Sequence, residues 1–208
     1  LTVLDARVRQ AVDTYDWTGV YPEIHAFCAT DLSAFHFDIR KDSLYCDAPG
    51  SHRRRSARTV LDVLHRCLCA WLAPVLVFTA EEAWLARFPD EEGSVHLTDF
   101  PFVPEGWKDD ALAERWRKVR EVRRFVYPSL EGLRRSGKIG SSLQAAVFFG
   151  IGEESEEGEE GEETSLTEAD AELLSEKDWE EVLIASAVGI IQDSSGPKPA
   201  RPLAVRVE

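Results

Sequence analysis

Residues 31–47 gather several side-chain types that can do chemistry, in the run DLSAFHFDIRKDSLYCD. Asp31, His36, Asp38 and Cys46 are of the kinds that hold metal ions or transfer protons. They can act together only if the element that carries them turns them toward one point. The spacing of the apolar residues around them shows whether it does.

Apolar residues from 21 to 46 recur at steps of three, four or seven, which predicts a helix with a narrow buried stripe. At the helical angle per residue the stripe is about 80° wide, and its members are Tyr21, Ile24, Cys28, Leu32, Phe35, Ile39 and Cys46. His36 would project about 140° to 160° away from Asp31 and Asp38 on such a helix, so the three cannot share a metal ion. We therefore expect a scaffold here, with Cys46 packed in the stripe and His36 lacking a partner nucleophile.

Composition and charge narrow the function classes. The chain has 208 residues, 44% of them hydrophobic, and no apolar run approaches the roughly 18 residues of a membrane span. The net charge is −14, but residues 153–208 hold 17 acidic and four basic residues, so the first 152 residues are nearly neutral. Basic residues cluster within that neutral part, and such clusters can bind phosphate backbones.

The start of the chain and its cysteines indicate the cellular compartment and the state of the thiols. The chain starts without Met, without a signal peptide and already in a helical pattern, so we expect a piece of a longer cytoplasmic protein with no membrane partner. Its four cysteines form no CxxC pair and no zinc-type spacing. We expect free thiols and no metal site.

The order of patterns predicts a mainly α fold. Residues 1–88 read as a helical bundle whose third long helix starts at a Ser51 cap and is divided at Pro74. Thr79 and Glu82 look like a capping box for the last helix, and Trp71 and Trp84 are expected in the core. Residues 89–108 read as an extended strap.

Residues 109–208 are expected to form a helix followed by a small α+β unit. The helix covers about 109–136 and is expected to be interrupted or bent near Pro128. Strands are expected at 141–151, 182–191 and 202–207. A further helix is predicted over 166–182. The Glu-rich stretch 152–164 cannot bury apolar area and is predicted to be a mobile loop.

Two blocks carry a family resemblance: FCATDLSAFHFDIRKDSLYCD at 27–47, and RRRSARTVLDVLHRCLCAWLAPVLVFTAEEAW at 53–84. They resemble the anticodon-binding region of bacterial isoleucyl-tRNA synthetases, which are class I aminoacyl-tRNA synthetases. His36 departs from the family, which usually has Tyr there. The later runs SVHLTDFP, KIGSSLQAAV and LIASAV extend the resemblance over residues 1–191.

The resemblance implies a parent enzyme that joins isoleucine to tRNA(Ile) with ATP and Mg, with Zn as a further candidate ion. The HIGH and KMSKS signatures of its catalytic domain do not occur here, and KIGSS at 138–142 lacks the second lysine. We therefore expect this chain to need no cofactor, to have no catalytic residue and not to aminoacylate alone. Its expected partners are tRNA(Ile) and the catalytic domain of the same polypeptide, in a monomer.

Basic and hydroxyl residues are the candidates for tRNA contact. Arg53, Arg54, Arg55 and Arg58 lie at a helix start, where phosphate is favoured, and Arg40 and Lys41 precede the same turn. Lys138, Ser141 and Ser142 follow a glycine turn and are expected to touch the tRNA backbone. The run RWRKVREVRR at 115–124 is a weaker candidate, because its other face is apolar.

Two other interpretations stay open at this point. One is the equivalent region of a valyl-, leucyl- or methionyl-tRNA synthetase. The other is a helical protein-interaction module whose acidic tail binds a basic partner.

Overall fold

The computed structural model of the 208-residue chain describes residues 1–89, 93–150, 173–191 and 203–206. Most of these residues are helical, which confirms the predicted fold class. The chain divides into two compact units, residues 1–108 and 109–208, and each is described by itself. The Glu-rich stretch 152–164 lies outside the described residues.

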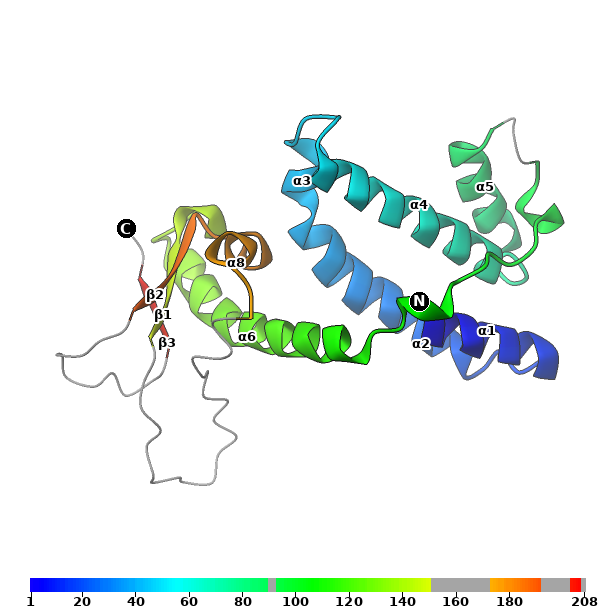
Figure 1. The fold of residues 1–208 in the computed structure, drawn as a ribbon, viewed down its shortest axis with the longest axis horizontal. Helices are drawn as coiled ribbons and strands as arrows, with labels where there is room; N and C mark the ends of the chain where they lie inside the picture. Colours follow the sequence, from blue (N-terminus) through cyan, green and yellow to red (C-terminus); the bar gives the residue numbers. More distant parts are fainter. Residues whose placement is uncertain (90–92, 151–172, 192–202, 207–208) are drawn as a thin grey trace, which may run out of the picture. The chain divides into compact units, whose positions relative to one another are not determined.

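The first unit opens with four helical segments (Figure 1). They are α1 (Thr2–Thr14), α2 (Val20–Ala26), the π-helix η1 (Phe27–Phe37) and the short α3 (Lys41–Tyr45). A regular α-helix was expected where η1 lies, and a π-helix of 11 residues is unusual because i→i+5 bonding normally occurs as single turns.

The predicted stripe along this segment is correct in its middle and wrong at its end. Ile24, Leu32 and Ile39 are buried. Cys46, expected to pack beside them, is exposed. The reason is that the helix turns at Arg40 and restarts as α3, so the register of the stripe does not continue to Cys46.

Two further helices and a strap complete the first unit. These elements are α4 (His52–Leu72), α5 (Val77–Arg87) and the 3-10 turns η2 (Val95–Leu97) and η3 (Glu105–Trp107). The division at Pro74 is confirmed, and so is the Ser51 cap, whose hydroxyl accepts a hydrogen bond from the Arg54 amide at 3.1 Å. The capping box at Thr79 is wrong, because α5 begins at Val77 and has no side-chain cap.

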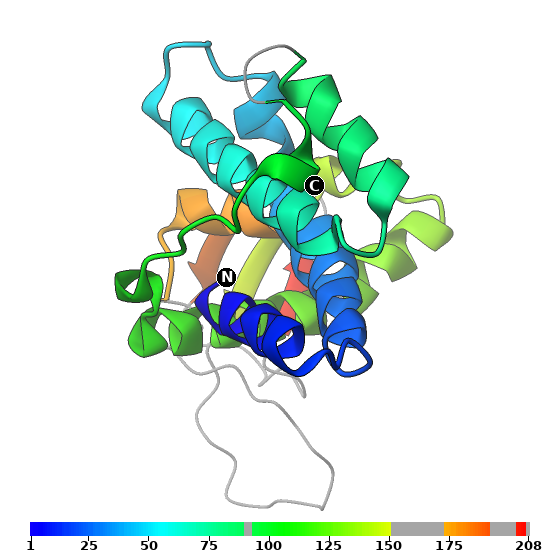
Figure 2. The ribbon, with the colours of Figure 1, turned by 90° about the vertical axis from the view of Figure 1, so that its right-hand side faces the viewer.

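Helix α4 belongs to both hydrophobic cores of the first unit. Cys67 and Trp71 pack with residues of α1, α2 and the strap, including Val8. Cys69 and Ala73 pack with residues of α5 and η2. Figure 2 shows α4 between these elements. Trp71 and Trp84 are buried, as predicted.

Charged groups also hold α4 against α5. Asp62 accepts hydrogen bonds from Arg66 at 3.2 Å and from Arg87 at 3.0 Å. Both guanidinium groups lie over the ring of Phe88, at 4.2 and 4.8 Å from its centre. Such cation–π contacts stabilise the pair of helices, and they commit these two arginines to the fold.

The second unit is built on one long helix and a small sheet (Figure 1). Its elements are α6 (Asp110–Arg135), η4 (Ser142–Gln144), β1 (Ala146–Gly150), α8 (Glu176–Leu183), β2 (Ala187–Ile191) and β3 (Leu203–Arg206). Helix α6 runs through Pro128 as one helix. Its buried face is Val119, Val122, Arg123, Val126 and Leu130, and it contacts α8 and β3.

The sheet has the order β2-β1-β3. β1 pairs with β2 in parallel and with β3 antiparallel, with Val147 opposite Val188 and Val205. α8 lies between the two parallel strands in the chain, as a crossover requires. The strand predicted from residue 182 starts only at Ala187, since α8 continues to Leu183 and ends at Ile184 in a left-handed conformation.

Within the described residues, no helix is both long and apolar enough to cross a membrane.

Removing the side chain of Trp71 should destabilise the first unit. Trp71 is fully buried, so Trp71→Ala should lower its free energy of unfolding by about 3–5 kcal/mol through lost burial and the cavity that remains. The matched control is Trp107→Ala, at a tryptophan that is 53% exposed. Urea unfolding followed by circular dichroism measures both. Equal losses would contradict the position of Trp71 in the core.

Removing the cap of α4 should have a smaller effect. Ser51→Ala should cost about 1 kcal/mol, because the Arg54 amide loses its acceptor. Ser56→Ala, an identical change at an exposed position inside the same helix, should be neutral or slightly stabilising, since Ala favours helix. Thermal unfolding of the two variants tests this difference, and a Ser56 loss as large as that of Ser51 would count against it.

Candidate nucleic-acid interface

The acidic and histidine residues of 31–38 lie on the π-helix η1 and just after it. The predicted angle between Asp31 and His36 assumed α-helical geometry, which η1 does not have. Even so, across the described part of the chain no three His, Cys, Asp or Glu side chains are grouped to hold a metal ion. Burial and the nearby Arg40 lower the pKa of His36, so its ring is neutral at pH 7. Asp38 pairs with Lys41 at 2.9 Å.

The buried cysteines are poor nucleophiles. All four cysteines are free thiols. Burial raises the pKa of Cys28, Cys67 and Cys69, which keeps them protonated at neutral pH. Cys69 lies 3.6 Å from Nε2 of His65, but its raised pKa is the opposite of what thiolate chemistry needs.

The tRNA candidates of the first unit meet where α3 packs against the start of α4 (Figure 1). This surface is called the basic corner, and its residues are Arg40, Lys41, Arg53, Arg54, Arg55 and Arg58. Arg40 and Lys41 lie at the start of α3, and the four other arginines lie in the first two turns of α4. The structure thus brings all six to one end of the bundle.

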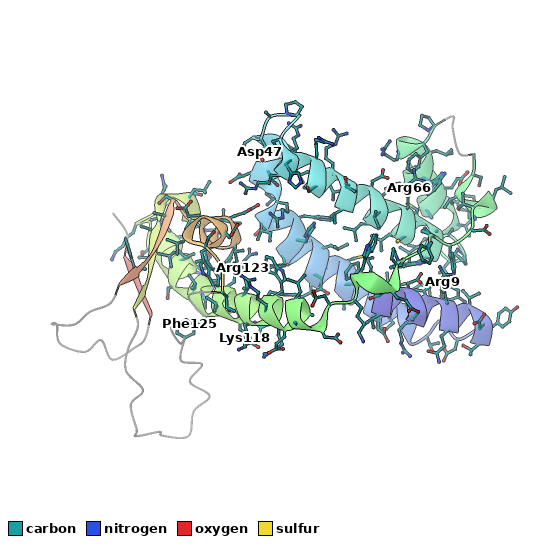
Figure 3. The ribbon with its side chains drawn as sticks, viewed as in Figure 1. Arg9, Asp47, Arg66, Lys118, Arg123 and Phe125 are labelled. Atoms are coloured by element: carbon teal, nitrogen blue, oxygen red, sulfur yellow. The ribbon has the colours of Figure 1, made fainter. Side chains whose placement is uncertain are left out.

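Arg54 is turned toward the protein. Its guanidinium donates to the carbonyl oxygen of Asp47 at 2.7 Å, across the turn that joins α3 to α4. Asp47, labelled in Figure 3, also accepts a hydrogen bond from the Ser51 hydroxyl through its carboxylate, at 3.3 Å. Arg54 therefore fixes the shape of the corner with its own side chain.

The other members of the basic corner differ in how exposed their charged groups are and in whether those groups already have a partner. Arg55 and Arg58 are exposed, and their guanidinium groups make no ion pair or hydrogen bond with any described residue. Arg40 and Arg53 are half-buried and already engaged. Lys41 is held by Asp38 in an exposed pair, which is weak enough to exchange for another anion.

The charges at the start of α4 oppose the stability of the helix. Its first turn holds His52, Arg53 and Arg54 and no acidic residue. The N-terminal end of a helix carries partial positive charge, so each cation near it costs about 0.3–1 kcal/mol. An anion bound at the corner would relieve this repulsion, and a phosphate group is the anion that such helix starts bind best.

The opposite end of α4 has no such charge. The α4–α5 turn exposes Val75, Leu76, Val77 and Phe78, the last of them 88% exposed, and no charged residue lies between Arg66 and Glu81. A 21-residue helix is about 30 Å long. The basic corner and this apolar turn are therefore well separated, and the two ends of α4 suit different surroundings.

Lys138, Ser141 and Ser142 belong to the second unit, whereas the basic corner belongs to the first. Lys138 follows Gly137, whose φ of 72° suits glycine, and its ammonium is exposed without a partner among the described residues. Ser141 caps the short turn η4 in a capping box with Gln144, and Ser142 is half-buried. Only the lysine presents a free charged group here.

The basic run 115–124 on α6 is largely used inside the second unit. Arg117 pairs with Glu114 and Glu121, and its hydrogen bond to Glu114 is the main cause of its raised pKa. Arg115 donates to the carbonyl oxygen of Leu173 at 2.8 Å. Arg123, labelled in Figure 3, is buried. Its guanidinium lies over the ring of Tyr127. Arginines here mostly stabilise the fold.

One exposed aromatic residue at the basic corner was not singled out from the sequence. Tyr45 ends α3 and is 80% exposed. A signal was present, because Tyr45 lies off the apolar stripe and directly before the polar turn that precedes Arg53. An aromatic residue outside the stripe and close to a run of arginines indicates an exposed side chain that can contact a binding partner.

Comparisons with known proteins place the chain in a family. The sequence model of a family described as the anticodon-binding domain of tRNA ligase matches residues 1–149. An isoleucine–tRNA ligase of Gluconobacter oxydans is 52% identical over 187 residues, which is 89% of this chain and 18% of the relative. An isoleucine–tRNA ligase of Agrobacterium fabrum is 45% identical over 200 residues, covering 95% of this chain and 19% of the relative.

The chain thus spans about a fifth of the length of these curated relatives. The family match covers the whole first unit and continues through α6 into β1, so it includes both the basic corner and the Lys138 turn. The chain belongs to the family of anticodon-binding domains of tRNA ligases.

Proposed function

We propose that this chain is the tRNA-binding region of an isoleucine–tRNA ligase, and that the basic corner binds the anticodon arm of tRNA(Ile). The parent enzyme would join isoleucine to this tRNA with ATP and Mg, in the cytoplasm and as a monomer, with its catalytic domain in the same polypeptide. The relatives named isoleucine–tRNA ligase support the amino acid in this proposal.

The observation that carries the proposal is the uncompensated charge of Arg55 and Arg58. Other basic groups of the first unit, such as Arg7, Arg66 and Arg87, are paired with carboxylates. Arg55 and Arg58 are exposed at a helix start that already repels cations. A surface that keeps unpaired arginines against this repulsion is suited to a polyanion.

Within the basic corner, the contacts divide by side-chain orientation. Arg55 and Arg58 supply the main phosphate contacts, and Lys41 adds a third when it leaves Asp38. Arg40 and Arg53 contribute positive potential from half-buried positions. Arg54 acts by holding the turn through Asp47.

The second unit adds a weaker contact through Lys138, Ser141 and Ser142. Lys138 would bind a backbone phosphate, and the two serine residues lie beside it on the turn and η4. Backbone contacts of this kind position the nucleic acid without reading its sequence.

Arg55→Ala and Arg58→Ala should each weaken tRNA binding severalfold. Each phosphate contact that is lost should also reduce the slope of log affinity against log salt concentration by about 0.7–0.9. Filter binding or gel shift with tRNA(Ile) over a range of salt concentrations measures both effects.

The matched control is Arg7→Ala, which removes an exposed arginine that is paired with Glu23 at 2.9 Å. Affinity and salt slope should stay as in the unchanged chain. If the unchanged chain, shown to be folded, binds no tRNA at low salt, the proposed function is wrong.

Lys138→Ala should have a smaller effect of the same kind, with a slope reduced by about 0.7. Lys118→Ala is its matched control, because Lys118 is also exposed in the second unit but lies on α6 among paired charges (Figure 3). The same salt titration compares them. Equal behaviour of the two variants would remove Lys138 from the interface.

A further inference from the structure

No hydrogen bond or ring contact within the described residues explains why a tyrosine occupies position 45. Tyr45 ends α3, is 80% exposed, and its side chain makes no hydrogen bond, ring contact or electrostatic interaction with another described residue. Two other tyrosines do contact neighbouring side chains in the fold. Tyr21 stacks on Trp17 with ring centres 5.8 Å apart, and Tyr127 lies beneath the guanidinium of Arg123.

Tyr15 gives a useful contrast, because it is exposed to a similar degree, 89%. It ends α1 in a left-handed conformation and lies between Asp13 and Asp16, so its surroundings are acidic. Tyr45 is also flanked in the sequence by acidic residues, Asp42 and Asp47, but it ends α3, and α3 packs against α4, whose first two turns carry the arginines of the basic corner. Exposure does not distinguish the two rings, and neither do the acidic residues next to them in the sequence; the basic helix start that packs against α3 does.

The backbone that presents Tyr45 is held from both sides. The amides of Cys46 and Asp47 donate to the carbonyl oxygen of Asp42 at 2.8 and 3.3 Å. Arg54 holds the carbonyl oxygen of Asp47 at 2.7 Å. The ring therefore starts from a fixed backbone and has few side-chain rotations to lose on binding, which lowers the entropic cost of a contact.

An exposed aromatic ring on a fixed backbone, at the same corner as unpaired arginines, matches the chemistry of unpaired RNA. Single-stranded nucleic acids are bound by cations along the phosphates together with aromatic rings on which bases stack. A duplex offers phosphates but keeps the faces of its bases inside the stack. The arginines of the corner would bind either form, whereas the tyrosine ring can add affinity only where a base is unpaired.

We propose that Tyr45 stacks on an unpaired base of RNA bound at the basic corner, so that the corner prefers a single-stranded loop to a duplex. This inference rests on the proposed function. Arg54 is then a positioning residue, since its hydrogen bond to Asp47 fixes the turn that follows Tyr45.

The test uses the full 208-residue chain and two RNA probes, a hairpin with an unpaired loop and a fully paired duplex of equal length. Tyr45→Ala should weaken hairpin binding by about fivefold or more, the low end for one stacked base, and leave duplex binding unchanged. Its salt slope should not change, because no charge is removed. Tyr45→Phe should retain the affinity for the hairpin.

Tyr15→Ala is the matched control and should change neither affinity. A second readout is Tyr45→Trp, whose additional fluorescence over the unchanged chain should be quenched by the hairpin and not by the duplex. Melting temperatures should stay level, because both tyrosines are exposed.

Three outcomes are decisive. Stacking is supported if Tyr45→Ala weakens binding to the hairpin while Tyr45→Phe and Tyr15→Ala keep their affinity for it. Unchanged hairpin binding in Tyr45→Ala, with Arg55→Ala still weakened, overturns stacking and leaves the proposed function standing. Absence of binding to either RNA by the unchanged chain overturns both.

Discussion

The burial of α4 on two sides is the constraint on which the first unit depends. Trp71 anchors one core and Cys69 the other, so the second half of α4 cannot rotate or shift without opening both. The first two turns lie beyond these cores. They are held instead by α3 and by the hydrogen bond from Arg54 to Asp47, so α4 is fixed at both ends and presents Arg55 and Arg58 in a defined direction.

Pairing decides which basic residues are available on that scaffold. Arg66 and Arg87 lock α4 to α5 through Asp62, and Arg117 is held between two glutamates. Counting positive charges along the sequence would rate the stretch 115–124, which contains Arg117, as highly as the corner. In the fold, nearby carboxylates pair with Arg66, Arg87 and Arg117. The basic corner differs because the first turn of α4 contains no acidic residue.

The sequence predicts the parts of this fold that follow from burial and backbone chemistry. Proline has no amide hydrogen, so the break after Leu72 follows from Pro74, and apolar spacing alone indicates that Trp71 and Trp84 are buried. The π-helix could not be predicted, because the choice of i→i+5 bonds depends on tertiary packing and leaves no local signature. The exposure of Cys46 follows from the turn at Arg40, which apolar spacing does not show.

The clustering of the basic residues could be predicted from the sequence. Which of them face inward and which outward was not predicted, although helical geometry contains that distinction. Taking the buried Ala57 as the inward direction of α4, Arg53 and Arg54 lie within about 60° of it on either side. Arg55 and Arg58 lie about 100° or more away. This rotation explains why the first pair is half-buried and the second exposed. Four arginines within six residues thus separate into two that build the corner and two that face outward, and the register of α4 in its two cores makes that separation.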